Sequence, residues 1–207
     1  MAAGHSLDLR SLDPSRTSKN RTIVFNFRRV ATNFFNFHGR RPLTSKNKTT
    51  MQRIGFGFDV HQLVPDRELW LGGIRIDHTL GLLGHSDADV LIHAICDALL
   101  GAANMRDIGY HFPDTAAETD GIDSKILLRR TVELIATKGY AVGNIDATVC
   151  AERPKLNPHI PAMQQCLAEV IGCDPDAVSI KATTTERLGY TGREEGISAY
   201  AVCLIHQ

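Results

Sequence analysis

Two short segments of the sequence combine carboxylate and imidazole side chains at spacings that suit a metal site. Asp59 and His61 are two residues apart, and in a strand such residues point to the same side. His93 lies in the apolar segment 90–95, so a buried imidazole there needs a polar partner. A metal is one such partner. Asp89, one helical turn earlier, is another, and it could orient an imidazole that binds the metal. Two histidines and one carboxylate form a common open zinc site, although a single histidine is more often an ordinary surface or core residue.

A second group of chemically active residues lies nearer the carboxyl end of the chain. The run 181–187 joins a lysine to three consecutive threonines and Glu186. Hydroxyl groups and a carboxylate beside a lysine suit phosphate oxygens and a hard cation such as Mg²⁺. Arg193 follows in a loop that contains two glycines, where a guanidinium can bind an anion. A β-branched strand end with a capping threonine remains the alternative interpretation.

Regular elements must position these residues, and the hydrophobic pattern predicts both strands and helices. Strands are predicted at 53–60, 144–151, 178–184 and 197–206, with a hairpin of 68–71 and 74–77 around Gly72-Gly73. Helices are predicted from a cap at Asp87 or Asp89 to about residue 100, over 124–138 with Ser124 as its cap, and over 158–171. Residues 80–84 and 104–118 are predicted to be loops. This order predicts an α+β fold, a mixed β-sheet with helices packed on one face, as in a ferredoxin-like sandwich.

The composition is that of a globular protein. The chain has 207 residues, of which 43% are hydrophobic and 22% charged, and it lacks the roughly 18 consecutive apolar residues of a membrane span. The five cysteines are odd in number and contain no C-x-x-C pair, which favours reduced thiols in a cytoplasmic protein over a disulfide framework. We expect a small-molecule substrate, and neither a nucleic acid nor a membrane as a partner.

Residues 1–50 differ from the rest of the chain. They carry ten Lys and Arg residues against two acidic ones, Asp8 and Asp13. Such a segment is typical of a transit peptide, which would direct the protein to a plastid, or of an arm that binds nucleic acid or membrane. We favour a third interpretation, a disordered leader or over-long start before Met51, because a complete domain is predicted over residues 51–207.

Five motifs, taken together and in this order, resemble the 2-C-methyl-D-erythritol 2,4-cyclodiphosphate synthase family of the non-mevalonate isoprenoid pathway. The resemblance covers residues 51–207 and does not extend to 1–50. The motifs are GFGFDVH at 55–61, GHSDADVLIHA at 84–94, DIGYHFPD at 107–114, ERPKLNPHI at 152–160 and KATTTERLGYTGREEGI at 181–197.

The resemblance implies a reaction and a set of residue roles. The family converts 4-diphosphocytidyl-2-C-methyl-D-erythritol 2-phosphate to the 2,4-cyclodiphosphate and releases CMP, as a phosphorus-oxygen lyase. Asp59, His61 and His93 match its zinc ligands, and Glu186 matches the ligand of a second cation, Mg²⁺ or Mn²⁺. His85 and Thr184 match its transition-state stabilisers. The matching substrate contacts are Ser86, Asp107, Ile108, Gly109, Phe112, Pro113, Asp114, Thr115, Ala116, Ala151, Glu152, Arg153, Pro154, Lys155, Leu156, Asn157, Thr183, Thr185, Tyr190 and Arg193.

The resemblance also implies an assembly, a homotrimer with active sites at the subunit boundaries. One subunit would supply the metal ligands and another the cytidine pocket. Two other functions remain open at this point. The same ligands could serve a metal-dependent phosphohydrolase, which would release inorganic phosphate, or a non-catalytic trimer that binds isoprenoid diphosphates.

Overall fold

The computed structural model describes residues 51–113 and 121–207 of the chain, and the structural statements below refer to these two ranges. The predictions for residues 1–50 and for Asp114, Thr115 and Ala116 lie outside the described residues.

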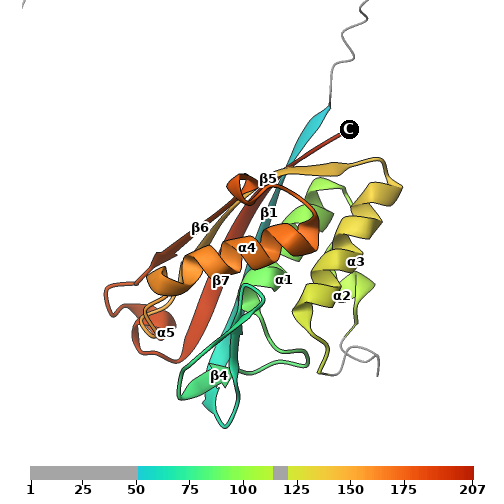
Figure 1. The fold of residues 1–207 in the computed structure, drawn as a ribbon. Helices are drawn as coiled ribbons and strands as arrows, with labels where there is room; N and C mark the ends of the chain where they lie inside the picture. The colour runs from blue at the N-terminus through green and yellow to red at the C-terminus, as the bar shows by residue number, and fades with distance from the viewer. Residues whose placement is uncertain (1–50, 114–120) are drawn as a thin grey trace, which may run out of the picture. The chain divides into compact units, whose positions relative to one another are not determined.

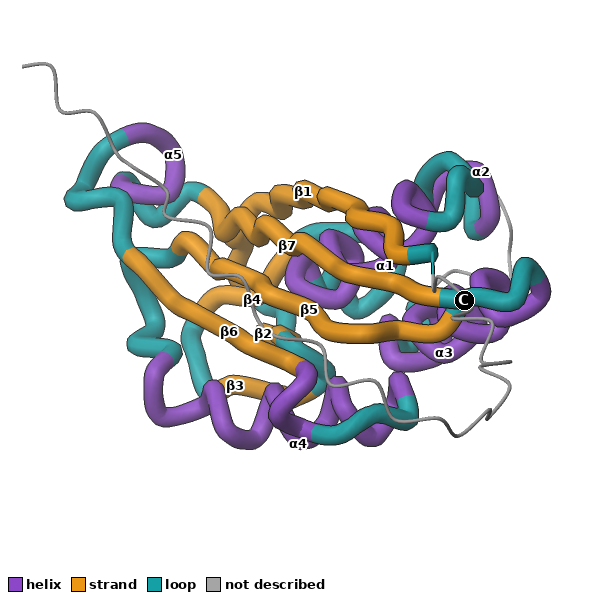
Figure 2. The backbone as a smooth tube through the Cα atoms, turned by 90° about the horizontal axis from the view of Figure 1, so that it is seen from above, coloured by secondary structure: helices purple, strands orange, loops and turns teal. Residues whose placement is uncertain are grey.

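The main sheet is built from five strands: β1 (Gln52–Pro65), β4 (Leu80–Leu82), β5 (Ala141–Cys150), β6 (Val178–Thr183) and β7 (Gly196–His206). Their order across the sheet is β4-β1-β7-β5-β6, and Figure 2 shows β1, β7, β5 and β6 side by side in this order. β5 and β6 are parallel, and the other neighbours are antiparallel. A separate hairpin of β2 (Leu69–Leu71) and β3 (Ile74–Ile76) turns at Gly72 and Gly73, both of which have positive φ, as the Gly-Gly pair predicts.

Three long helices pack on one side of this sheet (Figures 1 and 2): α1 (Val90–Ala102), α3 (Ser124–Thr137) and α4 (Ile160–Ile171). Shorter helical segments are α2 (Ile108–His111), α5 (Gly189–Gly192) and the 3₁₀ turns η1 (Asn157–His159) and η2 (Pro175–Ala177). The predicted mixed α+β architecture is therefore confirmed. Within the described residues, no helix combines the length and the apolar composition that crossing a membrane requires.

Several predicted boundaries are wrong, and each has a local cause. β1 continues past residue 60 because Leu63–Pro65 pair with β4. β4 itself lies in the segment 80–84, which was predicted to be a loop. The predicted loop 104–118 contains α2, because the carboxylate of Asp107 accepts a hydrogen bond from the backbone N–H of Tyr110 and begins a helical turn. Asp123, and not Ser124, caps α3 by accepting from the backbone N–H of Lys125.

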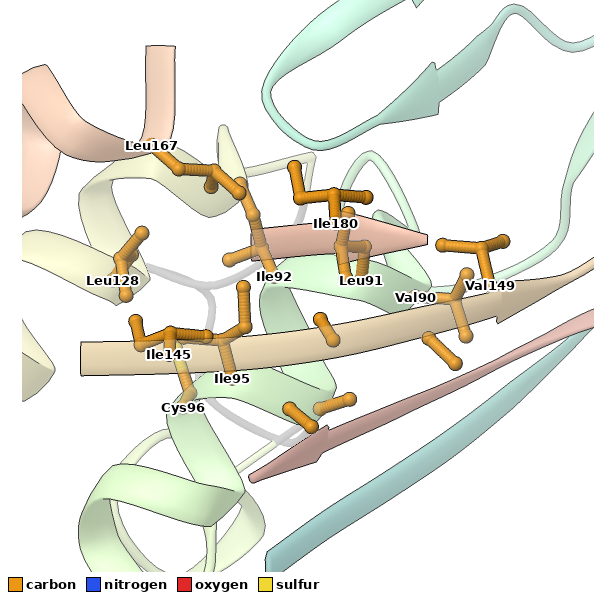
Figure 3. Packing of buried hydrophobic residues seen from close by; sticks show 14 of the residues in the cluster. Val90, Leu91, Ile92, Ile95, Cys96, Leu128, Ile145, Val149, Leu167 and Ile180 are labelled. Atoms are coloured by element: carbon orange, nitrogen blue, oxygen red, sulfur yellow. The ribbon is translucent and has the colours of Figure 1, made fainter. Parts of the chain in front are cut away.

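The hydrophobic core lies between the sheet and the helices (Figure 3). α1 is its centre, because all but three of its residues are buried. The labelled core residues are Val90, Leu91, Ile92, Ile95 and Cys96 of α1, Leu128 of α3, Ile145 and Val149 of β5, Leu167 of α4 and Ile180 of β6. All five cysteines are free thiols, as predicted. Burial raises the pKa of Cys96 to about 12 and that of Cys203 to about 11, so neither is a reactive thiolate.

Two glycines of β1 let α1 approach the sheet closely. A Cβ atom on Gly55 would lie 1.8 Å from the carbonyl oxygen of Ala98, and one on Gly57 would lie 2.0 Å from that of Ala94. No side chain fits in this space, so the strand and the helix are in backbone contact here.

The opposite side of β1 and β7 is apolar and exposed. Ile54 is 73% exposed and Phe56 is 63% exposed. Phe58, Val60, Tyr200 and Val202 are also exposed, and the rings of Phe58 and Tyr200 lie 5.0 Å apart. We call these six residues the apolar sheet face. A contiguous apolar surface of this kind is typical of an interaction site.

Candidate active site

The three predicted metal ligands come together between β1 and α1. One carboxylate oxygen of Asp59, Oδ2, lies 3.0 Å from Nε2 of His61 and 3.0 Å from Nδ1 of His93. The two imidazole nitrogens are 3.2 Å apart. Each residue thus directs one ligand atom to a common point, and the group could bind a metal ion.

Hydrogen bonds at the back of each ring determine which nitrogen faces this point. Nδ1 of His61 lies 2.7 Å from the carbonyl oxygen of Leu83 and must donate to it, which leaves a lone pair on Nε2. Nε2 of His93 lies 3.2 Å from Oγ of Ser86 and 3.1 Å from Oγ of Ser124, so its Nδ1 faces Asp59. Lone pairs this close repel each other unless a cation lies between them. Two imidazoles and one carboxylate are also ligands that zinc prefers, so the residues fit a divalent metal.

The charges at the site support the same conclusion. Burial alone would raise the pKa of Asp59, but hydrogen bonds with His61 and His93 outweigh it and hold that pKa well below its usual range. Burial alone would lower the pKa of His61, but the hydrogen bond and charge of Asp59 raise it. In the absence of metal the site therefore attracts positive charge as protons, which a metal must displace.

The prediction that Asp89 orients an imidazole is wrong. Asp89 is fully buried and accepts hydrogen bonds from the backbone N–H groups of Gly72 at 2.9 Å, Gly73 at 2.6 Å and Ile92 at 3.0 Å. It caps α1 and ties the β2–β3 turn to it. Burial and the charge of Asp87 raise the pKa of Asp89, against the lowering effect of these hydrogen bonds. Asp89 therefore affects the position of His93 only indirectly, by fixing the residue at which α1 begins.

A pocket of about 220 Å³ opens over the three candidate ligands. Five residues predicted from the resemblance line it: His85, Ser86, Ile108, Gly109 and Phe112. Asp107 caps α2 beside it, and Pro113 follows Phe112 at the end of the first described range.

Asp97, for which the sequence predicted no role, also lines this pocket. Its carboxylate accepts a hydrogen bond from the backbone N–H of Ile108 at 2.8 Å. Burial raises the pKa of Asp97 despite this bond. Its place on the helix face of His93, four residues further on, was the available signal.

A second pocket of about 630 Å³ contains four residues of the predicted cytidine site: Glu152, Arg153, Pro154 and Lys155. Ala151 and Leu156 are buried beneath this segment, and Asn157 begins η1. No residue lines both this pocket and the pocket over the candidate ligands.

The threonine-rich run 181–187 begins in the last residues of β6, and its Arg187 lines the second pocket. Oγ1 of Thr184 donates to Oε1 of Glu186 at 3.0 Å. Glu186 and Arg187 both have positive φ, at 53° and 64°, which is unfavourable for residues with a Cβ. One oxygen of Glu152 accepts from the backbone N–H groups of Thr185 at 3.1 Å and Arg187 at 3.0 Å. Glu152 therefore holds the unusual loop that presents Glu186.

The remaining predicted contacts lie on or next to this loop. Thr183 is the last residue of β6, and its hydroxyl donates to the carbonyl oxygen of Thr184 at 3.1 Å. Tyr190 lies in α5, and its hydroxyl is 2.8 Å from Oγ of Ser198. Arg193 follows α5 and forms two hydrogen bonds to Glu195, at 2.8 and 3.0 Å. Thr185 and Tyr190 line a further pocket next to α5. The predicted residues thus lie around the three clustered ligands and, apart from them, along the segments 151–157 and 183–193.

Comparisons with known proteins agree with this geometry. The model of the YgbB family matches residues 52–206. The chain is 77% identical over 155 residues to the 2-C-methyl-D-erythritol 2,4-cyclodiphosphate synthase of Bacteroides fragilis, covering 75% of this chain and 98% of that protein. A solved structure of a 2C-methyl-D-erythritol-2,4-cyclodiphosphate synthase in a CDP-bound form is 35% identical, with a TM-score of 0.69 and coverage of 74% of this chain and 99% of that chain.

A longer protein contains the same fold. The bifunctional IspDF from Campylobacter jejuni is 39% identical, with a TM-score of 0.74, over 76% of this chain. The match spans 43% of that longer chain. The family model and the closely similar relatives show that the chain belongs to the YgbB family.

Proposed function

We propose that the chain converts 4-diphosphocytidyl-2-C-methyl-D-erythritol 2-phosphate to 2-C-methyl-D-erythritol 2,4-cyclodiphosphate and releases CMP. The observation that carries this proposal is the cluster of Asp59, His61 and His93 in a pocket, in a chain 77% identical to a protein with the corresponding name. The similar synthase structure that was solved in a form bound to CDP supports a cytidine diphosphate group in the substrate.

The reaction joins two phosphates that repel each other. An oxygen of the 2-phosphate forms a bond to the β-phosphorus, and the bond from that phosphorus to the oxygen of CMP breaks. A divalent metal held by Asp59, His61 and His93 would supply positive charge beside a substrate phosphate. Ser86 and His85, which line the same pocket, would hold the phosphate in line for attack. No protein nucleophile is required.

The second cation is assigned to the loop that contains Glu186. Its ligands there are oxygen atoms, which suit Mg²⁺ or Mn²⁺, whereas the two imidazoles at the other site suit Zn²⁺. Thr184 and Lys155 would contact the diphosphate from the protein side. Thr184 already donates to Glu186, so the hydroxyl and the carboxylate are held together before substrate binds.

We further propose that the protein acts as a homotrimer with active sites shared between subunits. Two observations support this assembly. The apolar sheet face is exposed in the single chain, and the two groups of site residues line separate pockets. Joining the metal pocket of one subunit to the cytidine pocket of another would complete the site. The free thiols support the cytoplasm as the location.

Phosphorus NMR on the authentic substrate tests the proposed reaction. We expect a cyclic diphosphate and CMP to appear in equal amounts. Inorganic phosphate without a cyclic product would identify a phosphohydrolase instead. Binding without turnover in the presence of Zn²⁺ and Mg²⁺ would favour the non-catalytic trimer.

The change Glu186→Gln tests the second cation site. It removes the negative charge and keeps the side-chain length, so we expect turnover to fall by on the order of 100-fold, typical of losing one preorganised electrostatic contact. Zinc content should stay at the wild-type value, because Glu186 is not one of the clustered ligands. Steady-state kinetics at several Mg²⁺ concentrations, with metal analysis, measures both.

Glu169→Gln is the matched control for that variant. Glu169 is exposed on α4 and contacts Gln165 at 2.8 Å, so its loss should leave turnover unchanged. Normal turnover of the Glu186→Gln enzyme would contradict the assignment of the second cation.

A further inference from the structure

We propose that Asp87 and Ser124 fix the tautomer of His93, so that a bare Nδ1 faces the metal position. This inference rests on the metal centre of the proposed function but not on the reaction itself. Neither residue belongs to the predicted set of site residues. Both act through His93 and are therefore positioning residues.

The three side chains form a continuous chain of hydrogen bonds. Ser124 is the first residue of α3 and is fully buried. Its backbone N–H donates to Oδ2 of Asp87 at 3.0 Å, and its hydroxyl donates to Oδ1 of the same carboxylate. On its other side, Oγ of Ser124 lies 3.1 Å from Nε2 of His93. Both oxygens of Asp87 thus accept from this serine, and Oδ1 also accepts from the backbone N–H of Asp89 at 3.3 Å.

The chemistry of these groups determines where each proton lies. An ionised carboxylate accepts hydrogen bonds and cannot donate them. The single hydroxyl proton of Ser124 is therefore directed to Asp87, and Oγ can only accept from the imidazole. Nε2 of His93 must carry the proton. Since a neutral imidazole has one N–H, Nδ1 then has its lone pair available for a metal. Without a metal, the carboxylate of Asp59, 3.0 Å from Nδ1, competes for the same proton.

Ser86 gives partial support to the same tautomer. Its Oγ lies 3.2 Å from Nε2 of His93 and already accepts from the backbone N–H of Ala88 at 3.0 Å. It can accept a share of the imidazole proton. Unlike Ser124, it has no carboxylate beyond it, among the hydrogen bonds of the described residues, to fix the direction of its own hydroxyl.

This arrangement makes Asp87→Asn the sharpest test. An amide has one acceptor oxygen and one donor NH₂ group. Each oxygen position of Asp87 faces one backbone N–H, that of Ser124 at 3.0 Å and that of Asp89 at 3.3 Å. We expect the amide oxygen to face the nearer donor, Ser124, and the NH₂ group to face Oγ. The hydroxyl proton of Ser124 is then released toward Nε2 of His93. The neutral imidazole would carry its proton on Nδ1, and no lone pair would face the metal.

The experiment measures zinc affinity of the full chain by competition with a chelator at fixed pH. We expect Asp87→Asn to weaken zinc binding by about 100-fold and Ser124→Ala by about 10-fold, within the range for groups that orient a metal ligand. Ser124→Ala should cost less because Ser86 still accepts from Nε2. Asp123→Asn is the matched control. It changes the neighbouring aspartate, which caps α3 and pairs with Lys125. Because Asp123 is not part of the hydrogen-bonded chain that orients His93, we expect this variant to alter zinc affinity by less than about twofold.

A second readout reports the tautomer directly, with no metal present. Long-range ¹H–¹⁵N NMR of the metal-free Asp59→Ala protein, in which no carboxylate competes at Nδ1, should show the proton of the neutral His93 ring on Nε2. Adding Asp87→Asn should move it to Nδ1. A proton on Nδ1 in the Asp59→Ala protein would overturn the proposal, even if the double variant failed to fold. Unchanged zinc affinity in a folded Asp87→Asn protein would overturn it as well.

These outcomes are separate from failure of the proposed reaction. If zinc affinity and the tautomer depend on Asp87 while no cyclic product forms, the proposed reaction is wrong and the positioning role stands. If the cyclic product forms and the zinc affinity is the same in the wild type, the Asp87→Asn variant and the Ser124→Ala variant, only the positioning role is wrong.

Discussion

Replacing His93 with alanine is expected to remove the bound zinc and to reduce formation of the cyclic product by on the order of 1000-fold or more, because several kcal/mol of charge stabilisation would be lost. The change leaves two of the three ligands clustered at the site. It also leaves the carboxylate of Asp59 and the lone pair of His61 facing each other without a third group to share a cation. Metal analysis of the purified protein and the phosphorus NMR assay measure the two effects together.

His206→Ala is the control for this experiment. His206 is the last residue of β7 and pairs with residue 52 at the opposite end of β1 from His61. Its loss should leave zinc content and turnover close to the wild-type values. A His93→Ala enzyme with normal zinc content and full activity would show that another group holds the metal.

Replacing Gly57 with alanine is expected to destabilise the protein by about 3 kcal/mol or more, at the upper end for an overpacked core. The added Cβ would lie 2.0 Å from the carbonyl oxygen of Ala94 and 2.7 Å from the backbone nitrogen of Ala98. Both contacts are with backbone atoms of α1, which no rotamer change can move. Relief requires β1 and α1 to separate, and the distance between Asp59 and His93 would increase as they do. We therefore expect weaker zinc binding in any folded fraction.

Urea unfolding at one fixed protein concentration measures the change in stability, and Gly101→Ala provides the matched control. Gly101 lies within α1, and a Cβ there would have its nearest neighbour at 4.0 Å, the carbonyl oxygen of Phe56. Alanine at that position should stabilise the helix by roughly 0.5–1 kcal/mol. A Gly57→Ala protein as stable as the wild type would show that the strand and the helix are not in rigid contact.

The three clustered ligands show what the sequence alone can predict about the site. A two-residue spacing in a strand places Asp59 and His61 on one side, and the same alternation places Gly57 there and Phe58 on the other. An imidazole among apolar helix residues must find a polar partner. These rules concern residues that are close in the sequence, so they can be applied without knowing the fold. The five motifs of the family resemblance then implied the class of reaction.

The sequence could not predict which of two aspartates, Asp87 or Asp89, caps α1. Asp87 and Asp89 both precede α1 at positions suited to a cap. Asp89 takes the cap because Gly72 and Gly73, distant in sequence, donate to the same carboxylate. Asp87 is thereby left for Ser124, which is distant in the other direction. Spacing in the sequence cannot decide which of two aspartates caps a helix when the choice depends on hydrogen-bond donors from other elements of the fold.

The sequence by itself determined the fold class, the positions of the main strands and helices, and the identities of the three clustered ligands, because each depends on local periodicity or on motifs of short range. Only the tertiary structure decided how the ligands meet. Gly57 brings β1 against Ala94 of α1, and helical side chains tilt toward the helix N-terminus, so the ring of His93 reaches the level of Asp59. The nitrogen that faces Asp59 was likewise decided by partners that the folded chain alone brings together, because the direction of a shared proton depends on every group at both ends of the hydrogen bond.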